Sequence, residues 1–255
     1  EKVVIFSPYW FSFPEFVRIA GAEPIFVDTI AQKQFEPNFE DLNNKIDKSI
    51  KGIIINSPSN PTGGVWSDEA IKKTLKIAKD NDWLVISDET YEELVYDNDF
   101  KAIDSLNEIN AEVVTIRSMS KTYAMTGWRI GYTCGDKNVI KAMSKLQGQS
   151  TSCPNSIAQH AAVEALIGDQ GFVVNMREIF KKRRKLIVSK LNDLSGISCN
   201  MPGGAFYVFP SIKNYLGGVF KEIVVNSGSD FSLLLLEQKS VVTVAGDSFG
   251  APEHI

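Results

Sequence analysis

Six short, continuously apolar runs constrain the fold of this chain more than any other feature of its sequence. They lie at residues 3–6, 24–27, 52–55, 83–86, 113–116 and 130–133. Continuous rather than alternating hydrophobicity is typical of strands that are covered on both faces. Amphipathic stretches separate the runs: Ser67 is a candidate N-cap, and Ile71, Leu75 and Ala78 follow it at helical spacing. The alternation predicts an α/β fold with a mostly parallel sheet between helices and with ligands at the carboxyl ends of the strands.

The pattern changes after about Pro154. Two long helical patterns, at residues 155–166 and 171–194, lead into shorter strand candidates at residues 205–209 and 241–245. We therefore expect a large domain over residues 1–172 and a small α+β domain over residues 173–255, joined by a long helix.

Composition and charge exclude several classes of protein. The 255 residues include 27 basic and 31 acidic side chains, for a net charge of −4, which argues against a nucleic-acid or anionic-membrane partner. The one basic cluster, residues 181–185, is interpreted as a solvated helix face. No apolar run approaches the roughly 20 residues of a membrane span. Cys134, Cys153 and Cys199 fit neither a disulfide framework nor a metal site, so we interpret the chain as soluble, cytoplasmic and without a bound metal.

Signatures of other enzyme classes are absent from the sequence. It has no Gly-x-Gly-x-x-Gly and no P-loop, and only His160 and His254 for a Ser-His-Asp triad. His160 lies in an Ala-rich helical stretch, where we expect a structural role. The chain begins in an apolar strand without a methionine and stops abruptly at Ile255, so we expect it to be a middle portion of a longer protein.

A lysine with small hydroxyl neighbours follows the run that ends at Ile116. Lys121 lies in Ser118-Met119-Ser120-Lys121, and Arg129 follows eight positions later, at the start of the next run. On spacing alone, a surface lysine near an ion-pairing arginine explains this pattern as well as a functional site does.

This stretch resembles the lysine signature of the class I aminotransferases, which depend on pyridoxal 5′-phosphate (PLP). Residues 7–10, 56–63, 87–91 and 202–207 resemble the same family in the same order. The resemblance covers essentially the whole chain and is closest to the prokaryotic aspartate aminotransferases, particularly through residues 125–132 and 149–152. It implies fold type I of the PLP-dependent transferases, a three-layer α/β/α sandwich with a mostly parallel sheet, plus part of a smaller α+β domain. It also implies a homodimer.

The resemblance implies roles for the residues around the cofactor's ring. Lys121 would hold PLP as a Schiff base and then act as the catalytic proton shuttle at the substrate's α-carbon. Asp88 would keep the pyridine nitrogen protonated. Asn60 and Tyr91 would donate hydrogen bonds to the phenolic oxygen and lower the pKa of the Schiff base. Turn or cap roles are the structural alternatives for Asn60 and Asp88.

The resemblance also assigns the phosphate and the stacking contacts. Ser118 and Arg129 would hold the phosphate, for which a guanidinium fork is well suited. Trp10 would stack on the pyridine ring and exclude water, although a core tryptophan is the ordinary alternative. Trp10 and Asn60 would also contact the substrate.

The expected activity is that of an aminotransferase (EC 2.6.1.-) that moves an amino group between an amino acid, with aspartate the expected one, and a 2-oxo acid, 2-oxoglutarate. The arginine for the substrate's α-carboxylate is expected directly after Ile255. Gly148 stands where the animal-type enzymes have a second arginine, and the lysine that the prokaryotic branch uses instead is expected upstream of Glu1, so aspartate rests on resemblance alone. Cys153 departs from the asparagine or glycine that is usual in the family. The alternatives are another fold type I PLP enzyme (an aromatic or prephenate aminotransferase, or a C–S lyase) and a catalytically incomplete fragment.

Overall fold

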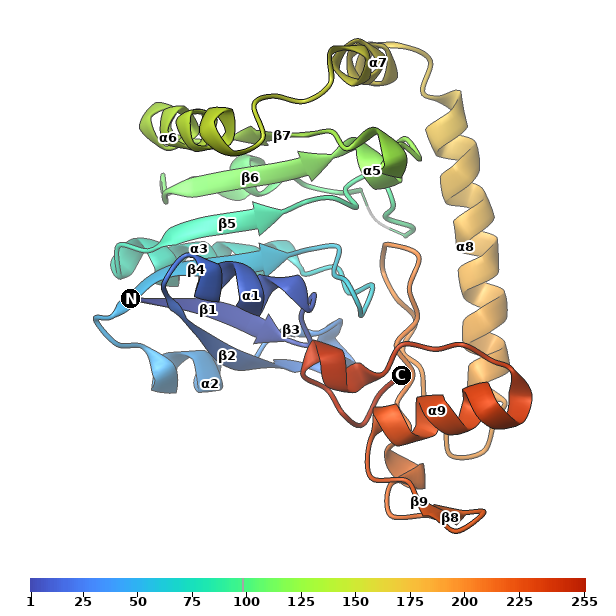
Figure 1. Ribbon diagram of the computed structural model, residues 1–255. Helices are drawn as coiled ribbons and strands as arrows, with labels where there is room; N and C mark the ends of the chain where they lie inside the picture. Colours follow the sequence, from blue (N-terminus) through green and yellow to red (C-terminus); the bar gives the residue numbers. More distant parts are fainter. Residues whose placement is uncertain (98) are drawn as a thin grey trace.

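A seven-stranded, mostly parallel sheet forms the centre of the molecule (Figure 1). The computed structural model describes residues 1–97 and 99–255. The strands lie in the order β3-β2-β1-β4-β5-β6-β7. The five inner strands are parallel, whereas β3 and β7 at the two edges run antiparallel to their neighbours. The strand bounds are β1 Lys2–Ser7, β2 Glu23–Ile30, β3 Glu36–Pro37, β4 Ile50–Asn56, β5 Leu84–Asp88, β6 Val113–Ser118 and β7 Gly131–Cys134. Each of the six apolar runs overlaps one of these strands.

Helices cover both faces of the sheet. Successive side chains of a strand point to opposite faces, so a continuously apolar strand presents apolar side chains on both. On one face, Val4, Ile53 and Ile55 belong to a buried cluster that includes side chains of α2 (Phe39–Lys45), α3 (Asp68–Asp80) and α4 (Ile103–Leu106). On the other face, Ile5 and Ile54 pack against Phe13 and Val17 of α1 (Ser12–Ile19). The expected three-layer α/β/α sandwich is confirmed.

The third helix follows the sequence pattern closely. The Ser67 hydroxyl caps α3 by accepting a hydrogen bond from the N–H of Ala70 at 3.2 Å, and Ile71, Leu75 and Ala78 are buried against the sheet. The polar cap fixes where α3 begins, and the apolar stripe packs it against the face of β4 and β5 that carries Ile53 and Val85.

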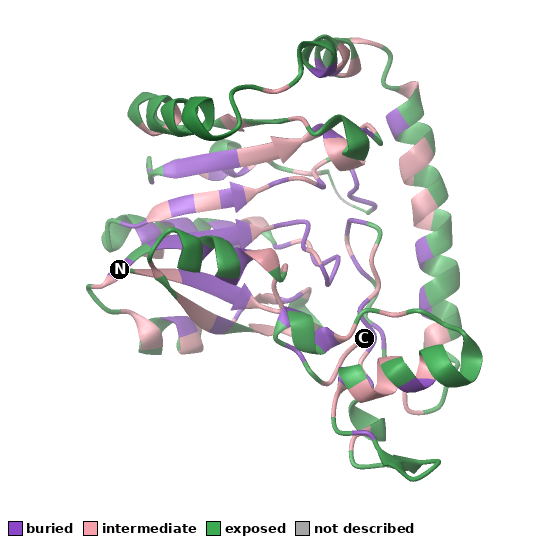
Figure 2. Ribbon diagram, in the orientation of Figure 1, coloured by how far each residue is buried: buried purple, intermediate pink, exposed green. Residues whose placement is uncertain are grey.

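The β7 side of the molecule is open to solvent (Figure 2). No residue of α6 (Lys137–Ser150) is buried, and only Ala158 and Ala162 of α7 (Ser156–Ile167) are. Leu146 on α6 and Ile167 on α7 are 72% and 76% exposed. These two helices thus present apolar side chains that nothing in the described part of the chain covers.

The long helix α8 (Gly171–Asn192) links the α7 end of the molecule to the C-terminal segment (Figure 1). At 1.5 Å per residue it is about 33 Å long. Beyond it lie α9 (Gly228–Lys239) and a two-stranded hairpin, β8 (Val219–Phe220) with β9 (Ile223–Val224). The expected division at residues 172 and 173 falls inside α8. The remaining helices are short: α5 Met119–Thr122 and the 3-10 turns η1 Ala31–Lys33, η2 Thr126–Trp128, η3 Lys213–Tyr215 and η4 Gly246–Phe249.

Two expectations about the second half of the chain are wrong. Residues 205–209 and 241–245 are not strands. A strand requires a neighbouring strand to which it is hydrogen-bonded along its length, and neither segment has such a neighbour among the described residues. The basic cluster at residues 181–185 is not a uniformly solvated face either. Arg184 is only 6% exposed, because α8 turns it inward toward Asp97. Among the described residues, none of the helices combines the length and the hydropathy that a bilayer span requires.

Candidate active site

A cavity of about 250 Å³ opens at the carboxyl ends of β4, β5 and β6. All seven residues to which the sequence assigned a role line it, although they come from positions as far apart as 10 and 129. Five further residues complete the lining. The full set is Trp10, Asn56, Asn60, Asp88, Thr90, Tyr91, Ser118, Ser120, Lys121, Thr126, Arg129 and Tyr207. Within the described part of the chain, neither histidine belongs to this lining.

The register of the parallel strands explains why these side chains meet. Asn56, the last residue of β4, pairs with Asp88, the last residue of β5. Ser118 ends β6, the next strand along the sheet. Because parallel strands end at the same edge, the turns that follow them converge on one point.

The carboxylate of Asp88 is held by its own turn. Its Oδ1 accepts hydrogen bonds from the Thr90 hydroxyl at 2.6 Å and from the Thr90 N–H at 3.1 Å. Burial raises the pKa of Asp88, and the two bonds from Thr90 oppose that rise. No hydrogen bond to Oδ2 is found among the described residues, so this oxygen is available to a ligand.

The turn that carries Asn60 is fixed by Asn56. The Asn56 side chain accepts from the N–H of Asn60 at 2.8 Å and donates to the carbonyl of Asp88 at 3.1 Å. The N–H of Gly63 closes the turn on the carbonyl of Ser59. Sequence reasoning missed Asn56, although a polar residue at the end of an apolar strand is itself a signal of a site.

Tyr91 contacts a second tyrosine that sequence reasoning also missed. The hydroxyl oxygens of Tyr91 and Tyr207 are 2.6 Å apart, and their rings meet edge to face. Burial raises the pKa of Tyr91, with Tyr207 and Asp88 adding to the rise and the Asn60 amide opposing it. Tyr91 is therefore a hydrogen-bond donor across the physiological pH range.

Lys121 stands in the short helix α5 directly after β6. The Ser118 hydroxyl caps that helix by accepting from the N–H of Ser120 at 3.1 Å. In the described part of the chain, the Nζ of Lys121 makes no hydrogen bond or ion pair. It lies 5.9 Å from the centroid of the Phe206 ring. The cavity thus contains an amine without a competing partner.

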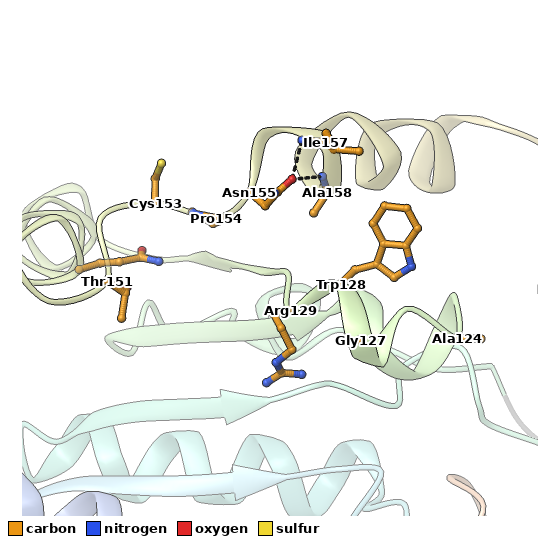
Figure 3. A pocket seen from close by; sticks show the side chains of 11 residues that line it. Ala124, Gly127, Trp128, Arg129, Thr151, Cys153, Pro154, Asn155, Ile157 and Ala158 are labelled. Carbon is orange, nitrogen blue, oxygen red and sulfur yellow. Dashed lines mark hydrogen bonds between the residues drawn. The ribbon is translucent and has the colours of Figure 1, made fainter.

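Arg129 also lines the cavity. Its backbone is left-handed (φ 53°), and one terminal nitrogen donates to the carbonyl of Thr126 at 2.8 Å. Figure 3 shows the guanidinium directed away from Trp128, the residue before it. Trp128 instead faces a wider hollow of about 810 Å³ between η2 and α7, which Cys153 and Asn155 also line. The left-handed backbone of Arg129 thus lets its side chain and that of Trp128 point in different directions.

Trp10 borders the cavity at the end of β1. Its indole packs edge-on against Phe13 and Phe16 of α1, with ring centroids 5.4 and 5.7 Å apart. These contacts hold the indole on the α1 side of the cavity.

A buried ion pair lies behind the cavity. Arg117 donates to one carboxylate oxygen of Glu89 through two nitrogens, at 3.1 and 2.8 Å, and Glu89 is 2% exposed. Glu89 follows Asp88 and Arg117 precedes Ser118, so the pair ties together two of the turns that build the site. The sequence offered no signal for this pair beyond its flanking motifs.

Comparison with known proteins assigns the family. The model of the family described as "Aminotransferase class I and II" matches residues 1–255. The chain belongs to this family. It is 40% identical to an aspartate aminotransferase of Bacillus subtilis (strain 168), over 100% of this chain and 64% of the relative. It is 42% identical to a probable aspartate/prephenate aminotransferase of Rhizobium leguminosarum bv. phaseoli, over 98% of this chain and 64% of the relative.

A solved structure gives the same result. The crystal structure of the aspartate aminotransferase from Rhizobium meliloti superposes with a TM-score of 0.94 at 36% identity, covering 100% of this chain and 64% of that one. The chain therefore spans about 64% of the length of the relatives it matches.

PLP is the cofactor of the class I and II aminotransferases, and the free groups in the cavity fit it. The unpaired amine of Lys121 matches an aldehyde, and the free oxygen of Asp88 matches a protonated ring nitrogen. The hydroxyl of Ser118 and the remaining guanidinium N–H groups of Arg129 match a phosphate. Among the described residues no group of three His, Cys, Asp or Glu side chains that could hold a metal ion is found.

Proposed function

We propose that the protein carrying this chain is a PLP-dependent aminotransferase that exchanges an amino group between aspartate and 2-oxoglutarate in alternating half-reactions. The observation that carries the proposal is the position of the Lys121 amine. Among the described residues this amine has no hydrogen-bond or ion-pair partner. It shares the cavity with Asp88 and Arg129, in a chain that belongs to the aminotransferase family.

PLP would supply an aldehyde that Lys121 holds as a Schiff base and a protonated ring that withdraws electrons from the substrate's α-carbon. Asp88 keeps the proton on the ring nitrogen through its free Oδ2. Asn60 and Tyr91 donate to the phenolic oxygen. Ser118 and Arg129 bind the phosphate.

Lys121 has a second task once the substrate's amino group has replaced its own. Its freed Nζ would act as a general base on the proton of the α-carbon and then as a general acid at the cofactor carbon that had been the aldehyde, two bonds away. Trp10 closes one side of the cavity and keeps water from that proton.

Aspartate is supported by the relatives, several of which bear the name aspartate aminotransferase at about 40% identity. A second candidate substrate pair uses prephenate as the amino acceptor, because the relative that is 42% identical is named a probable aspartate/prephenate aminotransferase. We further propose a cytoplasmic homodimer, with residues 1–172 as the cofactor domain and residues 173–255 in the small domain. The exposed apolar side chains of α6 and α7 support this homodimer, because exposed apolar patches often mark interfaces with another chain.

The cofactor assignment is tested by reduction. The full-length protein is incubated with PLP, treated with borohydride and digested, and the labelled peptide is sequenced. We expect the label on Lys121 and no label in a Lys121→Ala variant. Label that persists in this variant would place the attachment elsewhere.

The substrate assignment is tested separately. The full-length protein is supplied with aspartate and either 2-oxoglutarate or prephenate, and the amino products are quantified. Transfer to 2-oxoglutarate supports the leading proposal, and transfer to prephenate supports the second. A labelled Lys121 without either transfer would contradict the substrates and leave the cofactor assignment intact.

A further inference from the structure

The hydroxyl groups of Tyr91 and Tyr207 form a side-chain hydrogen bond inside the cavity between residues that are far apart in the sequence. Their oxygens are 2.6 Å apart, and the two residues are separated by 116 positions. Both hydroxyls stay protonated, because burial raises the pKa of each tyrosine above its ordinary value. The contact is therefore a hydrogen bond between two neutral phenols.

Tyr207 reaches this place because its backbone is bound to the turns that build the site. The N–H of Gly204 donates to the carbonyl of Gly63 at 2.9 Å, in the turn that carries Asn60. The N–H of Ala205 donates to the carbonyl of Leu94 at 2.8 Å, three residues beyond Tyr91. The segment that carries Tyr207 is thus aligned with both phenolic-oxygen donors.

A hydrogen bond between two hydroxyls contains a single proton, so one tyrosine donates and the other accepts. When Tyr91 donates to Tyr207, it has no proton left for any other acceptor. When Tyr207 donates, the Tyr91 proton is free for an acceptor in the cavity. The first arrangement would leave the Tyr207 proton, and not the Tyr91 proton, for an acceptor in the cavity. Only the second arrangement lets Tyr91 donate to that acceptor while it stays bonded to Tyr207.

We propose that Tyr207 is a positioning residue, whose hydroxyl donates to Tyr91 and so commits the Tyr91 proton to the phenolic oxygen of bound PLP. This inference rests on the proposed function. Because accepting a hydrogen bond strengthens the donation that follows it, Tyr207 also makes Tyr91 a better donor. Tyr207 thereby tunes the protonation of the cofactor through Tyr91.

The test is the pH dependence of the absorbance of lysine-bound PLP in the full-length protein. Hydrogen-bond donation to the phenolic oxygen lowers the apparent pKa of this species. We expect Tyr207→Phe to raise that pKa by about 0.3 to 1 unit, the effect of weakening one hydrogen bond. Tyr91→Phe should raise it further, and the double variant should match Tyr91→Phe, because Tyr207 acts through Tyr91.

Two outcomes overturn the inference. One is an unchanged pKa in Tyr207→Phe, and the other is a Tyr207→Phe shift that persists in the Tyr91→Phe background, which would mean that Tyr207 acts directly. Tyr215→Phe is the matched control. It also removes one hydroxyl, which donates to the Ser195 carbonyl outside the cavity, and should leave the pKa unchanged. A protein with no absorbance band dependent on Lys121 would instead contradict the proposed function itself, and the role of Tyr207 with it.

Discussion

Glu89 and Arg117 form a buried ion pair that joins the ends of β5 and β6. One carboxylate oxygen receives two guanidinium nitrogens at 3.1 and 2.8 Å, and the other accepts from the N–H of Ile103 at 2.8 Å. The two partners differ in exposure, since the side chain of Glu89 is 2% exposed and that of Arg117 is 27% exposed. The two ends of the pair should therefore respond differently to substitution.

We expect Arg117→Met to destabilise the protein by about 3 to 5 kcal/mol, because it leaves a carboxylate buried without its counterion. Glu89→Gln should cost less, about 1 to 3 kcal/mol, because Arg117 can turn its charge toward water. Urea unfolding at pH 7 measures both. The double variant Glu89→Leu with Arg117→Met should be more stable than Arg117→Met alone, and a double variant less stable than it would refute this account.

We expect Glu92 to make the stability of the protein depend on pH. Its Oε2 is buried, and among the described residues no partner for it is found. Burial raises the pKa of Glu92 to about 7, although Arg117 opposes the rise. Between its ordinary pKa and 7, the unfolded chain releases this proton while the folded chain keeps it, so stability falls as pH rises through that window, by up to about 3 kcal/mol.

Glu92→Gln should remove this loss. The free energy of unfolding of the variant, minus that of the parent, should grow between pH 4.5 and pH 7 and then level off. Urea unfolding across this range provides the measurement. Glu93→Gln is the control, because it deletes the adjacent carboxyl group, which is 49% exposed and near Arg177. A slope shared by both variants would point to net charge rather than to burial.

Gly63 lies where the Asn60 turn meets the segment of Tyr207. Its φ is +65°, and a Cβ there would lie 2.5 Å from the Cβ of Pro202 and 2.8 Å from the carbonyl oxygen of Gly204. We expect Gly63→Ala to cost about 1 to 2 kcal/mol for the left-handed backbone and about 1 to 3 kcal/mol more for the collision. It should also weaken PLP binding, because Asn60 moves with the turn.

Gly21→Ala separates these two costs. Gly21 has a φ of +78°, and a Cβ there would meet nothing within 4 Å. This variant should show the backbone cost alone and bind PLP normally. Equal destabilisation of the two variants, measured by thermal unfolding, would mean that the contact between the two segments adds nothing.

Arg184 binds α8 to the segment that carries Tyr207. Its guanidinium makes two bonds to Asp97, at 2.7 and 3.1 Å, and one to the carbonyl of Pro202 at 2.7 Å. We expect Arg184→Met to increase hydrogen exchange at the amides of Gly204 and Ala205 at least tenfold, because their segment loses this attachment. Arg183→Met, which removes the exposed neighbouring charge, should leave that exchange unchanged; a similar increase in both would assign the effect to net charge.

The sequence predicts the parts of this molecule that depend on local pattern. The six apolar runs become strands because each is flanked by turns and covered on both faces. By contrast, β3 was missed because Glu36 and Pro37 carry no hydrophobic pattern. The strand candidate at residues 241–245 fails for the opposite reason, since a favourable pattern forms no strand without a hydrogen-bonded neighbour.

The same distinction holds for the cavity. The resemblance to aminotransferases identified Lys121 and Asp88 because their motifs are contiguous in sequence. It did not identify a role for Tyr207 or for Arg184, because each acts through a partner more than 80 positions away. Sequence reasoning at a single site contains no information about such pairs.

The alignment of the Tyr207 segment with the Asn60 and Tyr91 turns has a consequence for the order of folding. Contacts between residues 116 positions apart require closure of a long loop, which is slow relative to local structure. The sheet and its helices can therefore form before the cavity does. During synthesis the cavity is complete only after Tyr207 has left the ribosome and docked. A ligand that binds only the complete cavity therefore binds only fully folded chains. It stabilises them against unfolding, and the stabilisation grows with the concentration of the ligand.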